Sequence, residues 1–327
     1  MKPTILKAWP EMEEYASLLT SPSESSKITP LFNIDFSECY VVDSCGLAAF
    51  LLKIMQYAKK FKEGNMSWIS TGFDNNVALK ENIVKLRFFN PLKSSCYDPL
   101  LFASEYSSSN DAPVEAEIFG AYKLSFPLIY IDFFNSNDRR NTGIILLRQF
   151  LYERLLNYSN TYNFNIMQFI SIIIELIKNT ADHTNANAIF GMDLLEANNS
   201  MKINFFYGDL GIGIMRHIKR YLKQINDPRW EHLSLAGAYY IACSKGFTSK
   251  PNNGINFGIG MSTVIEFAKT MDMRLSVFDA FSRGLLSEID ITSQSELNTH
   301  SQMRRNFFIY SRRNPFCYFG TLRAGRR

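Results

Sequence analysis

The sequence predicts a two-domain α/β protein, and its length, apolar content and order of strand-like and helix-like runs support this prediction. The chain has 327 residues, which gives room for two domains. Hydrophobic residues make up 46% of it, so each domain can build a core. Strand-like runs alternate with helix-like runs in both halves. We expect one domain in residues 1–100, a linker with one or two strands in 101–144, and a second domain in 145–327.

The first domain is expected to alternate strands and helices. Residues 30–36 alternate polar and apolar side chains as a strand does, and residues 11–19 are helix-like. A second strand leads into a helix through Asp43, Ser44 and Cys45, and both Asp and Ser are favoured at a helix start. Residues 66–72 and 78–88 are expected to form the next strand and helix.

The second domain contains a helix with one polar and one apolar face. Glu175 and Asn179 are four residues apart and therefore share a face, which Asp182 continues. The apolar residues between 169 and 177 fill the other side and can pack on a sheet. An amide oxygen suits Mg²⁺, and a carboxylate can accept a proton from a group that attacks a phosphate. Taken alone, this motif also fits an amphipathic helix with a solvated polar face.

A second motif follows a strand-like run at residues 202–207. Asp209 stands at the expected end of this strand, and Gly211 and Gly213 come directly after it. Glycines at this place allow a tight turn and a close approach of the backbone to a ligand. A glycine-rich turn without a ligand is the alternative.

A third motif leads from a loop into an apolar helix at residues 261–270. It contains Gly258, Gly260, Met261 and Ser262. The N–H groups at a helix start favour phosphate, although two glycines before a helix are weak evidence alone.

The remaining elements of this half can be placed more coarsely. Residues 214–257, which begin with a basic run, are expected to be partly helical, and residues 273–278 and 285–291 to form a hairpin. The chain should close with a strand at 315–323. Seven arginines lie between Arg304 and Arg327 with no acidic residue among them, and we expect them on a solvated edge strand rather than on a nucleic-acid surface.

In this order, the three motifs resemble the N, G1 and G2 boxes of the GHKL ATPase superfamily, which includes gyrase B subunits, histidine kinases and anti-sigma-factor serine kinases. The resemblance covers about residues 145–325. It implies a Bergerat-type α/β sandwich, in which a mixed sheet is covered by helices on one face and Mg-ATP is bound. It also implies that Asn179 is the magnesium ligand, Glu175 the general base and Asp209 the reader of the adenine amino group. Thr248 and Lys250 would face the γ-phosphate, or else lie in an exposed loop. The nucleotide-binding residues that the resemblance implies are Asn179, Asp182, Asp209, Gly211, Gly213, Thr248, Lys250, Gly258, Gly260, Met261 and Ser262.

Residues 40–52 resemble the strand-to-helix junction of STAS domains in anti-anti-sigma factors. In those proteins a GHKL kinase phosphorylates the serine that follows the aspartate, and Ser44 occupies that position. Cys45 replaces the usual serine or threonine after it. Ser44 is therefore a possible phosphoacceptor, or only a helix cap.

Two functional classes follow. The first is a regulatory serine/threonine kinase or switch that resembles an anti-sigma factor fused to its STAS antagonist. The second is an ATP-gated module that hydrolyses ATP slowly and phosphorylates no protein. The four histidines include none on a long helix before the ATPase-like half, which argues against a sensory histidine kinase.

The composition predicts the setting. Five cysteines without a C-x-x-C pair and an N-terminus without a signal-peptide core predict a reducing cytoplasm. A net charge of +4 does not predict nucleic-acid binding, and no run is long enough to span a bilayer. The expected partners are ATP and a protein partner or a second copy of the chain.

Overall fold

The computed structural model is mixed α/β, and its description covers about two thirds of the chain. The described residues are 4–6, 31–36, 39–60, 67–71, 77–88, 113–118, 120–131, 137–183, 186–244, 247, 260–280, 286–290, 303–304 and 316–327. Within them lie seven α-helices and one large open sheet. No helix in this described part is long and apolar enough to cross a membrane.

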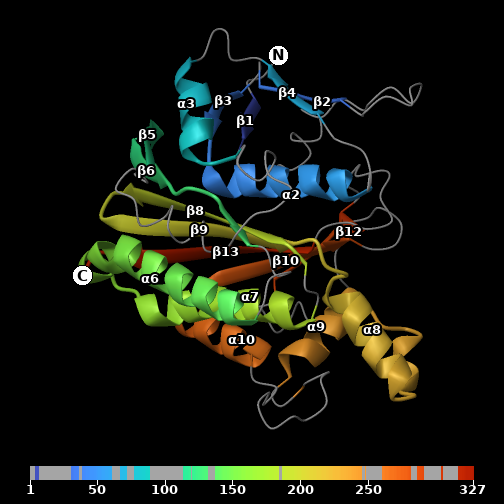
Figure 1. Cartoon of the computed structure of the whole chain (residues 1–327). Coiled ribbons are helices and arrows are strands. Elements are labelled where there is room, and N and C mark those ends of the chain that lie inside the picture. The colour runs from blue at the N-terminus through green and yellow to red at the C-terminus, as the bar shows by residue number, and fades with distance from the viewer. Residues whose placement is uncertain are drawn as a thin grey trace.

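One large sheet organises the molecule (Figure 1). Its strands are β5 (Val114–Ile118), β6 (Ala121–Ser125), β7 (Ile129–Ile131), β8 (Ala188–Ala197), β9 (Ser200–Asp209), β10 (Arg274–Ala280), β11 (Leu286–Asp290), β12 (Met303–Arg304) and β13 (Phe316–Gly325). The order is β12-β11-β10-β13-β9-β8-β6-β5, and β7 also pairs with β8. The expected hairpin of β10 and β11 is confirmed, and the segment expected as a linker contains strands, of which β6 and β7 pair with β8 of this sheet.

Two expectations about the sheet were wrong. Every described pairing in it is antiparallel, so it is not mixed. In addition, β13 is not an edge strand, because it lies between β10 and β9 and pairs with β9 over its full length, from Phe316 opposite Asp209 to Gly325 opposite Ser200. Most of the tail arginines lie outside this strand in the sequence. Within the strand, the side chains of Tyr318 and Leu322 are buried and pack it into the sheet.

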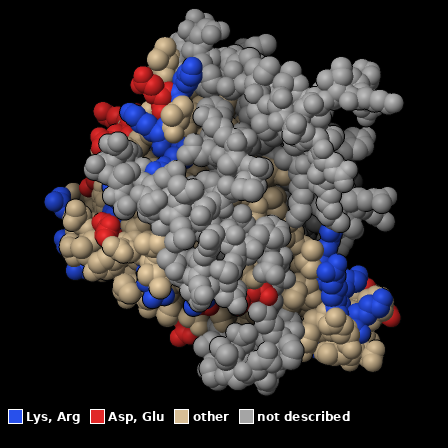
Figure 2. Space-filling view, viewed as in Figure 1, with Lys and Arg blue, Asp and Glu red and all other residues tan. Residues whose placement is uncertain are grey.

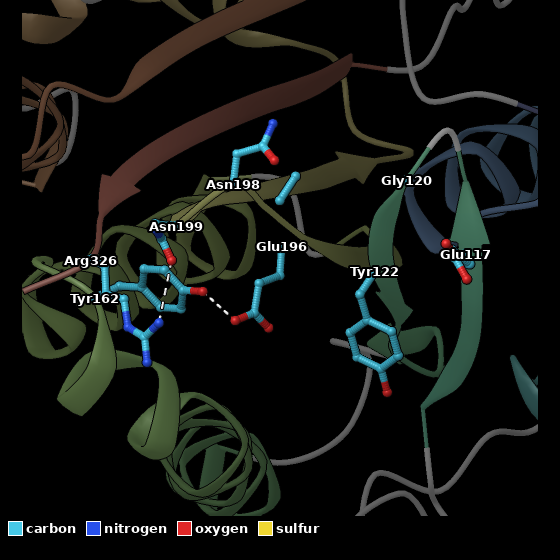
Figure 3. A pocket seen from close by; sticks show the side chains of 9 residues that line it. Glu117, Gly120, Tyr122, Tyr162, Glu196, Asn198, Asn199 and Arg326 are labelled. Carbon is cyan, nitrogen blue, oxygen red and sulfur yellow. Dashed lines mark hydrogen bonds between the residues drawn. The ribbon is translucent and has the colours of Figure 1, made fainter.

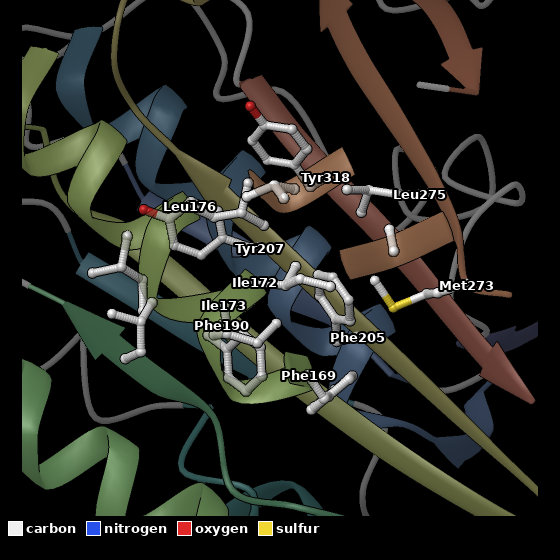
Figure 4. Packing of buried hydrophobic residues seen from close by; sticks show 14 of the residues in the cluster. Phe169, Ile172, Ile173, Leu176, Phe190, Phe205, Tyr207, Met273, Leu275 and Tyr318 are labelled. Atoms are coloured by element: carbon white, nitrogen blue, oxygen red, sulfur yellow. The ribbon is translucent and has the colours of Figure 1, made fainter. Parts of the chain in front are cut away.

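One face of the sheet is covered by α6 (Asn137–Thr161), α7 (Ile166–His183) and α10 (Gly260–Thr270) (Figure 1). The apolar side of α7 packs on aromatic side chains of β8 and β9 (Figure 4). Phe169 meets Phe205 edge to face with ring centroids 5.9 Å apart. Ile173 and Leu176 are fully buried beside it. Each such side chain contributes roughly 1.5–3 kcal/mol on burial, so α7 is held rigidly against the sheet.

The opposite face is covered by α2 (Ser44–Lys60), so helices lie on both faces rather than on one (Figure 1). Two glycines allow α2 to approach β8 and β9 closely. A Cβ at Gly191 would lie 2.5 Å from the carbonyl oxygen of Ser44, and a Cβ at Gly208 would overlap Leu52. Larger residues at these two positions would push α2 away from the sheet.

The N-terminal elements lie beyond α2. β1 (Thr4–Leu6) pairs in parallel with β3 (Cys39–Val42), and β2 (Leu31–Asp35) pairs in parallel with β4 (Ser67–Thr71). With α2 and α3 (Val77–Lys85), they confirm the expected strands and helices at 30–36, 66–72 and 78–88. The helix expected at residues 11–19 lies outside the described residues. The boundary between the two expected domains stays a prediction.

Candidate functional site

The helix α7 carries the first motif and begins at a side-chain cap. Asn165 Oδ1 accepts hydrogen bonds from the backbone N–H groups of Met167 and Gln168, both at 3.1 Å. Glu175 and Asn179 follow on the polar face, as predicted. Lys178 Nζ donates to Glu175 Oε1 at 2.9 Å, and the Glu175 side chain keeps 27% of its surface exposed. Glu175 can therefore reach a ligand with its second oxygen.

The third motif meets the first at this place. Gly260 is the first residue of α10, and α10 packs on α7. A Cβ added to Gly260 would lie 3.3 Å from Glu175 Oε2 and 3.5 Å from Asn179 Oδ1. The fold thus brings together three residues that the sequence separates by up to 85 positions.

The second motif lies at the end of β9, next to the same helix. Asp209 is only 2% exposed, and its two carboxylate oxygens have separate donors. Thr180 Oγ1 donates to Oδ2 at 2.9 Å, and the N–H of Gly211 donates to Oδ1 at 2.7 Å. Gly213 then turns the chain into α8 (Ile214–Gln224) with a φ of 77°, a conformation that favours glycine.

These residues fit a magnesium nucleotide. Asn179 Nδ2 is buried, and no described atom accepts a hydrogen bond from it, so this amide has bonding capacity to spare. Amide oxygen and carboxylate are the ligands that Mg²⁺ prefers, usually together with phosphate oxygens. The missing side chain at Gly260 lets the backbone at the start of α10 come close to Glu175 and Asn179.

The other predicted site residues divide into three groups. Asp182 is partly buried on α7, and Ser262 is partly buried on α10. Met261 packs in the core instead, where Tyr318 Oη donates to its sulfur at 3.7 Å. Thr248, Lys250 and Gly258 lie outside the described residues.

The segment after the second motif is partly helical, as predicted. It contains α8, a short 3-10 helix at Pro228–Trp230 and α9 (Leu235–Cys243). Basic side chains gather over α8 (Figure 2). Lys219 and Lys223 stand over the ring of Trp230, 5.9 and 5.3 Å from its centroid. The apolar face of α8 is buried, so its basic run occupies the solvated face.

Ser44 does begin a helix, but the structure does not present it to a phosphate donor. The residue is fully buried, and its Oγ accepts a hydrogen bond from the N–H of Met192 at 3.1 Å. Its own N–H donates to Asp193 Oδ1 at 2.9 Å, and the N–H of Cys45 donates to Asp193 Oδ2 at 2.9 Å. Phosphorylation of Ser44 would therefore require α2 to leave the sheet.

Asp193 belongs to a buried ionic cluster that joins α2 to the sheet. Lys123 Nζ lies 3.4 Å from Asp43 Oδ2, and Asp43, Lys123 and Asp193 are each less than 10% exposed. Burial alone would lower the pKa of Lys123, but the charges of Asp193 and Asp43 outweigh it and raise that pKa. Lys123 is therefore a cation that balances part of the negative charge at the start of α2.

A cavity of about 360 Å³ lies at the other end of β8 and β9. It is lined by Glu117, Tyr122, Tyr162, Glu196, Asn199 and Arg326 among others (Figure 3). Tyr162 donates a short hydrogen bond to Glu196, and Arg326 donates to Asn199. The β8–β9 turn at this cavity is nine residues along the strand from Asp209, or about 30 Å. The cavity is thus separate from the predicted site.

Several residues of the candidate site and of the buried ionic cluster were not identified from the sequence. Thr180 and Lys178 lie inside the first motif, but nothing in a single sequence says that Thr180 reaches Asp209. A threonine in a helix usually bonds the carbonyl four residues back, and Leu176 O indeed lies 3.4 Å away. Asp193 and Lys123 are polar residues in apolar strands, and that unusual position was the only available signal.

No protein-family model, curated protein or solved structure matches the chain significantly. The resemblance to GHKL ATPases and STAS domains therefore rests on the sequence motifs.

Proposed function

We propose that the chain is a regulatory protein that binds Mg-ATP between α7, the end of β9 and the start of α10. The observation that carries the proposal is the convergence of Glu175, Asn179 and Gly260. If α7 were only an amphipathic helix with a solvated polar face, its two polar side chains would have no reason to lie beside Gly260, which comes from a distant motif. The hydrogen bond from Thr180 to Asp209 supports the proposal, because it joins the end of β9 to the same helix.

Each residue then has a distinct role. Asn179 would offer its oxygen to Mg²⁺, which neutralises charge on the transferring phosphate when it is bound. Glu175 would accept the proton of the attacking hydroxyl or water through Oε2, while Lys178 holds Oε1. The N–H groups at the start of α10 would contact phosphate oxygens. Asp209 would accept a hydrogen bond from the adenine amino group.

The burial of Ser44 favours one of the two functional classes. In a kinase fused to its own substrate, the acceptor hydroxyl must reach the γ-phosphate, but Ser44 faces β8 on the opposite side of the sheet from α7. An ATP-gated module that hydrolyses ATP slowly has no such requirement. A kinase that acts on another protein remains the second candidate, and a protein partner or a second copy of the chain remains the expected target of the signal.

The test separates binding from chemistry. Glu175→Ala should abolish γ-phosphate release while ATP affinity changes little, because a general base acts mainly in the transition state. Asn179→Ala should lose magnesium-dependent binding in calorimetry. Glu153→Ala removes a carboxylate from the exposed face of α6 and serves as the matched control. Equal loss of binding in both site variants would show that α7 is only structural, and a wild type that binds no Mg-ATP would end the proposal.

A further inference from the structure

The cavity at the β8–β9 turn is large enough for one small molecule. Its volume of about 360 Å³ lies within the range of ligand pockets. Its wall comes from β5, β6, the β8–β9 turn, the residue after α6 and the residue after β13 (Figure 3). None of the described residues that line it belongs to the three sequence motifs. A ligand in this cavity would therefore bind separately from a nucleotide at the candidate site.

Backbone hydrogen bonds fix the shape of this wall. Asn198 and Asn199 form the two-residue turn between β8 and β9, with φ angles of 48° and 59° that asparagine tolerates. The N–H of Arg326 donates to the carbonyl oxygen of Asn199 at 2.9 Å. The N–H of Asn163 donates to the carbonyl oxygen of Gly325, also at 2.9 Å. The turn, the end of β13 and the segment after α6 are thus joined, so the fold itself shapes the cavity.

Two carboxylates and an aromatic ring stand in a row across three strands of this wall. Glu117 on β5 is paired with Tyr122 on β6, and Tyr122 is paired with Glu196 on β8. Residues directly opposite each other point to the same face of a sheet, so the ring of Tyr122 lies between the two acidic side chains. Neighbouring strands are about 4.8 Å apart, which places the backbones of Glu117 and Glu196 roughly 10 Å apart. We call these three residues the acidic row.

The acidic row is negatively charged. Neither Glu117 nor Glu196 forms an ion pair with another described residue. Glu196 accepts a short hydrogen bond from Tyr162, which leaves its charge in place. Arg326 is the basic residue of the wall, but it donates to Asn199, and in Figure 3 it lies beyond Tyr162, on the side away from the row. The row therefore presents negative charge and hydrogen-bond acceptors to a ligand.

The hydroxyl of Tyr122 does not compete for these two carboxylates. It donates to Glu115, and this hydrogen bond, followed by burial, raises the pKa of Tyr122 to about 12. The ring is therefore a neutral aromatic surface between Glu117 and Glu196. An ammonium group donates charge-assisted hydrogen bonds to a carboxylate, and the face of an aromatic ring attracts a cation. The acidic row thus has the chemistry of a site for an organic cation.

A metal ion fits this arrangement less well. Mg²⁺ and Ca²⁺ take about six or more oxygen ligands, and the described part of the chain contains no group of three or more side chains placed to hold a metal ion. We propose that the cavity binds a short aliphatic diamine, with one ammonium group at Glu117, the other at Glu196 and the methylene chain along the ring of Tyr122. This site does not depend on the proposed binding of Mg-ATP.

Calorimetric titration of the full chain with putrescine, a four-carbon diamine, tests the proposal. We expect saturable binding and a loss of at least about tenfold in affinity in Glu117→Gln and in Glu196→Gln, because each change removes one charged hydrogen-bond acceptor. Tyr122→Leu should weaken binding, whereas Tyr122→Phe, which keeps the ring, should not. Butylamine, which has the same chain length and one ammonium group, should bind about tenfold more weakly than putrescine. Glu153→Gln, on the exposed face of α6, is the matched control and should bind putrescine as the wild type does.

The outcomes separate clearly. Saturable binding that falls in both glutamine variants of the row, and not in Glu153→Gln, supports the proposal. It is overturned if the wild type gives no heat of binding with millimolar putrescine, or if both variants bind as tightly as the wild type. Equal displacement of putrescine by Mg²⁺ also overturns it, because that result indicates a general attraction of cations. Glu196→Gln also alters the hydrogen bond from Tyr162, so if this variant does not fold, the exposed Glu117→Gln variant still decides.

Discussion

Asp193 should be the residue that holds α2 on the sheet, and its removal tests how the two parts of the chain are joined. The carboxylate is 1% exposed and accepts two backbone N–H groups from the first turn of α2, each at 2.9 Å. It thereby satisfies donors that a helix start leaves without partners, and its charge is favourable at the positive end of the helix.

The expected cost of Asp193→Ala follows from these contacts. Each hydrogen bond to a buried charged group is worth roughly 1.5–3 kcal/mol. Breaking a buried ionic arrangement by removing one member costs about 3–5 kcal/mol. The two estimates overlap, so we expect a loss of about 3–5 kcal/mol in the free energy of unfolding. That is a large fraction of the 5–15 kcal/mol, roughly, that stabilises a typical domain.

Chemical denaturation measures the total loss in the free energy of unfolding. The reactivity of the Cys45 thiol shows whether α2 has separated from the sheet. Cys45 is 1% exposed between α2 and the sheet, so a thiol reagent can reach it only when α2 opens. Labelling followed by peptide mass spectrometry should be slow in the wild type and fast in Asp193→Ala. Gly191→Ala perturbs the same contact without touching a charge, since its Cβ would press on the carbonyl oxygen of Ser44.

The control is Glu153→Ala, an exposed carboxylate on α6, which should change stability by about 0.5 kcal/mol or less. If Asp193→Ala loses less than about 1 kcal/mol and Cys45 stays protected, Asp193 does not anchor α2 and the reasoning is wrong.

Three further predictions concern the site, the pH response and Ser44. Gly260→Ala should weaken Mg-ATP binding by about 1–3 kcal/mol in calorimetry with little change in melting temperature, because the new methyl group crowds the space beside Asn179; an unchanged affinity would place the phosphates elsewhere. Stability should fall as pH rises above about 8.5, where the thiol of Cys45 ionises in the unfolded chain, because burial and then the charges of Asp193 and Asp43 raise its pKa well above the ordinary value in the folded chain. Urea midpoints between pH 7 and 10 check the slope, which Cys45→Ala should reduce. Intact-mass measurement after incubation with Mg-ATP should find no phosphate on Ser44 in the native chain, and one added phosphate that Ser44→Ala abolishes would show that α2 opens readily.

Local patterns predicted the elements that carry the candidate site. The apolar stripe and polar face of α7 depend on residues within a few turns of one another, and so does the run of β9 into Asp209. The start of α2 at Ser44 was predicted for the same reason. Spacing alone also grouped Glu175 with Asn179, because a helix fixes which side chains share a face.

The failures concern contacts between distant parts of the chain. Asp43 caps α2 locally by accepting from the N–H of Gly46, as the sequence predicts, but the N–H of Ser44 donates to Asp193, 149 residues later. A single sequence has no local signal for such a pair. The central place of β13 depends on its pairing with both β9 and β10, which strand propensity cannot indicate. The packing of α2 on the second face of the sheet requires glycine at 191 and 208, where a larger side chain would clash with the helix. This requirement can be recognised only when the position of the helix is known.

The strand β9 connects the candidate site with the docking of α2. Side chains on a strand point alternately to its two faces, so neighbouring residues serve different partners. Gly208 provides the close approach of Leu52 from α2, and Asp209, the next residue, bonds Thr180 of α7 on the opposite face. We therefore expect a shift at the end of β9 to change the packing of Leu52 on Gly208, and a displacement of α2 to change the backbone beside Asp209. Ser44 is held against β8 by Met192 and Asp193, and Leu52 lies against Gly208 of β9, so both central strands hold the same helix.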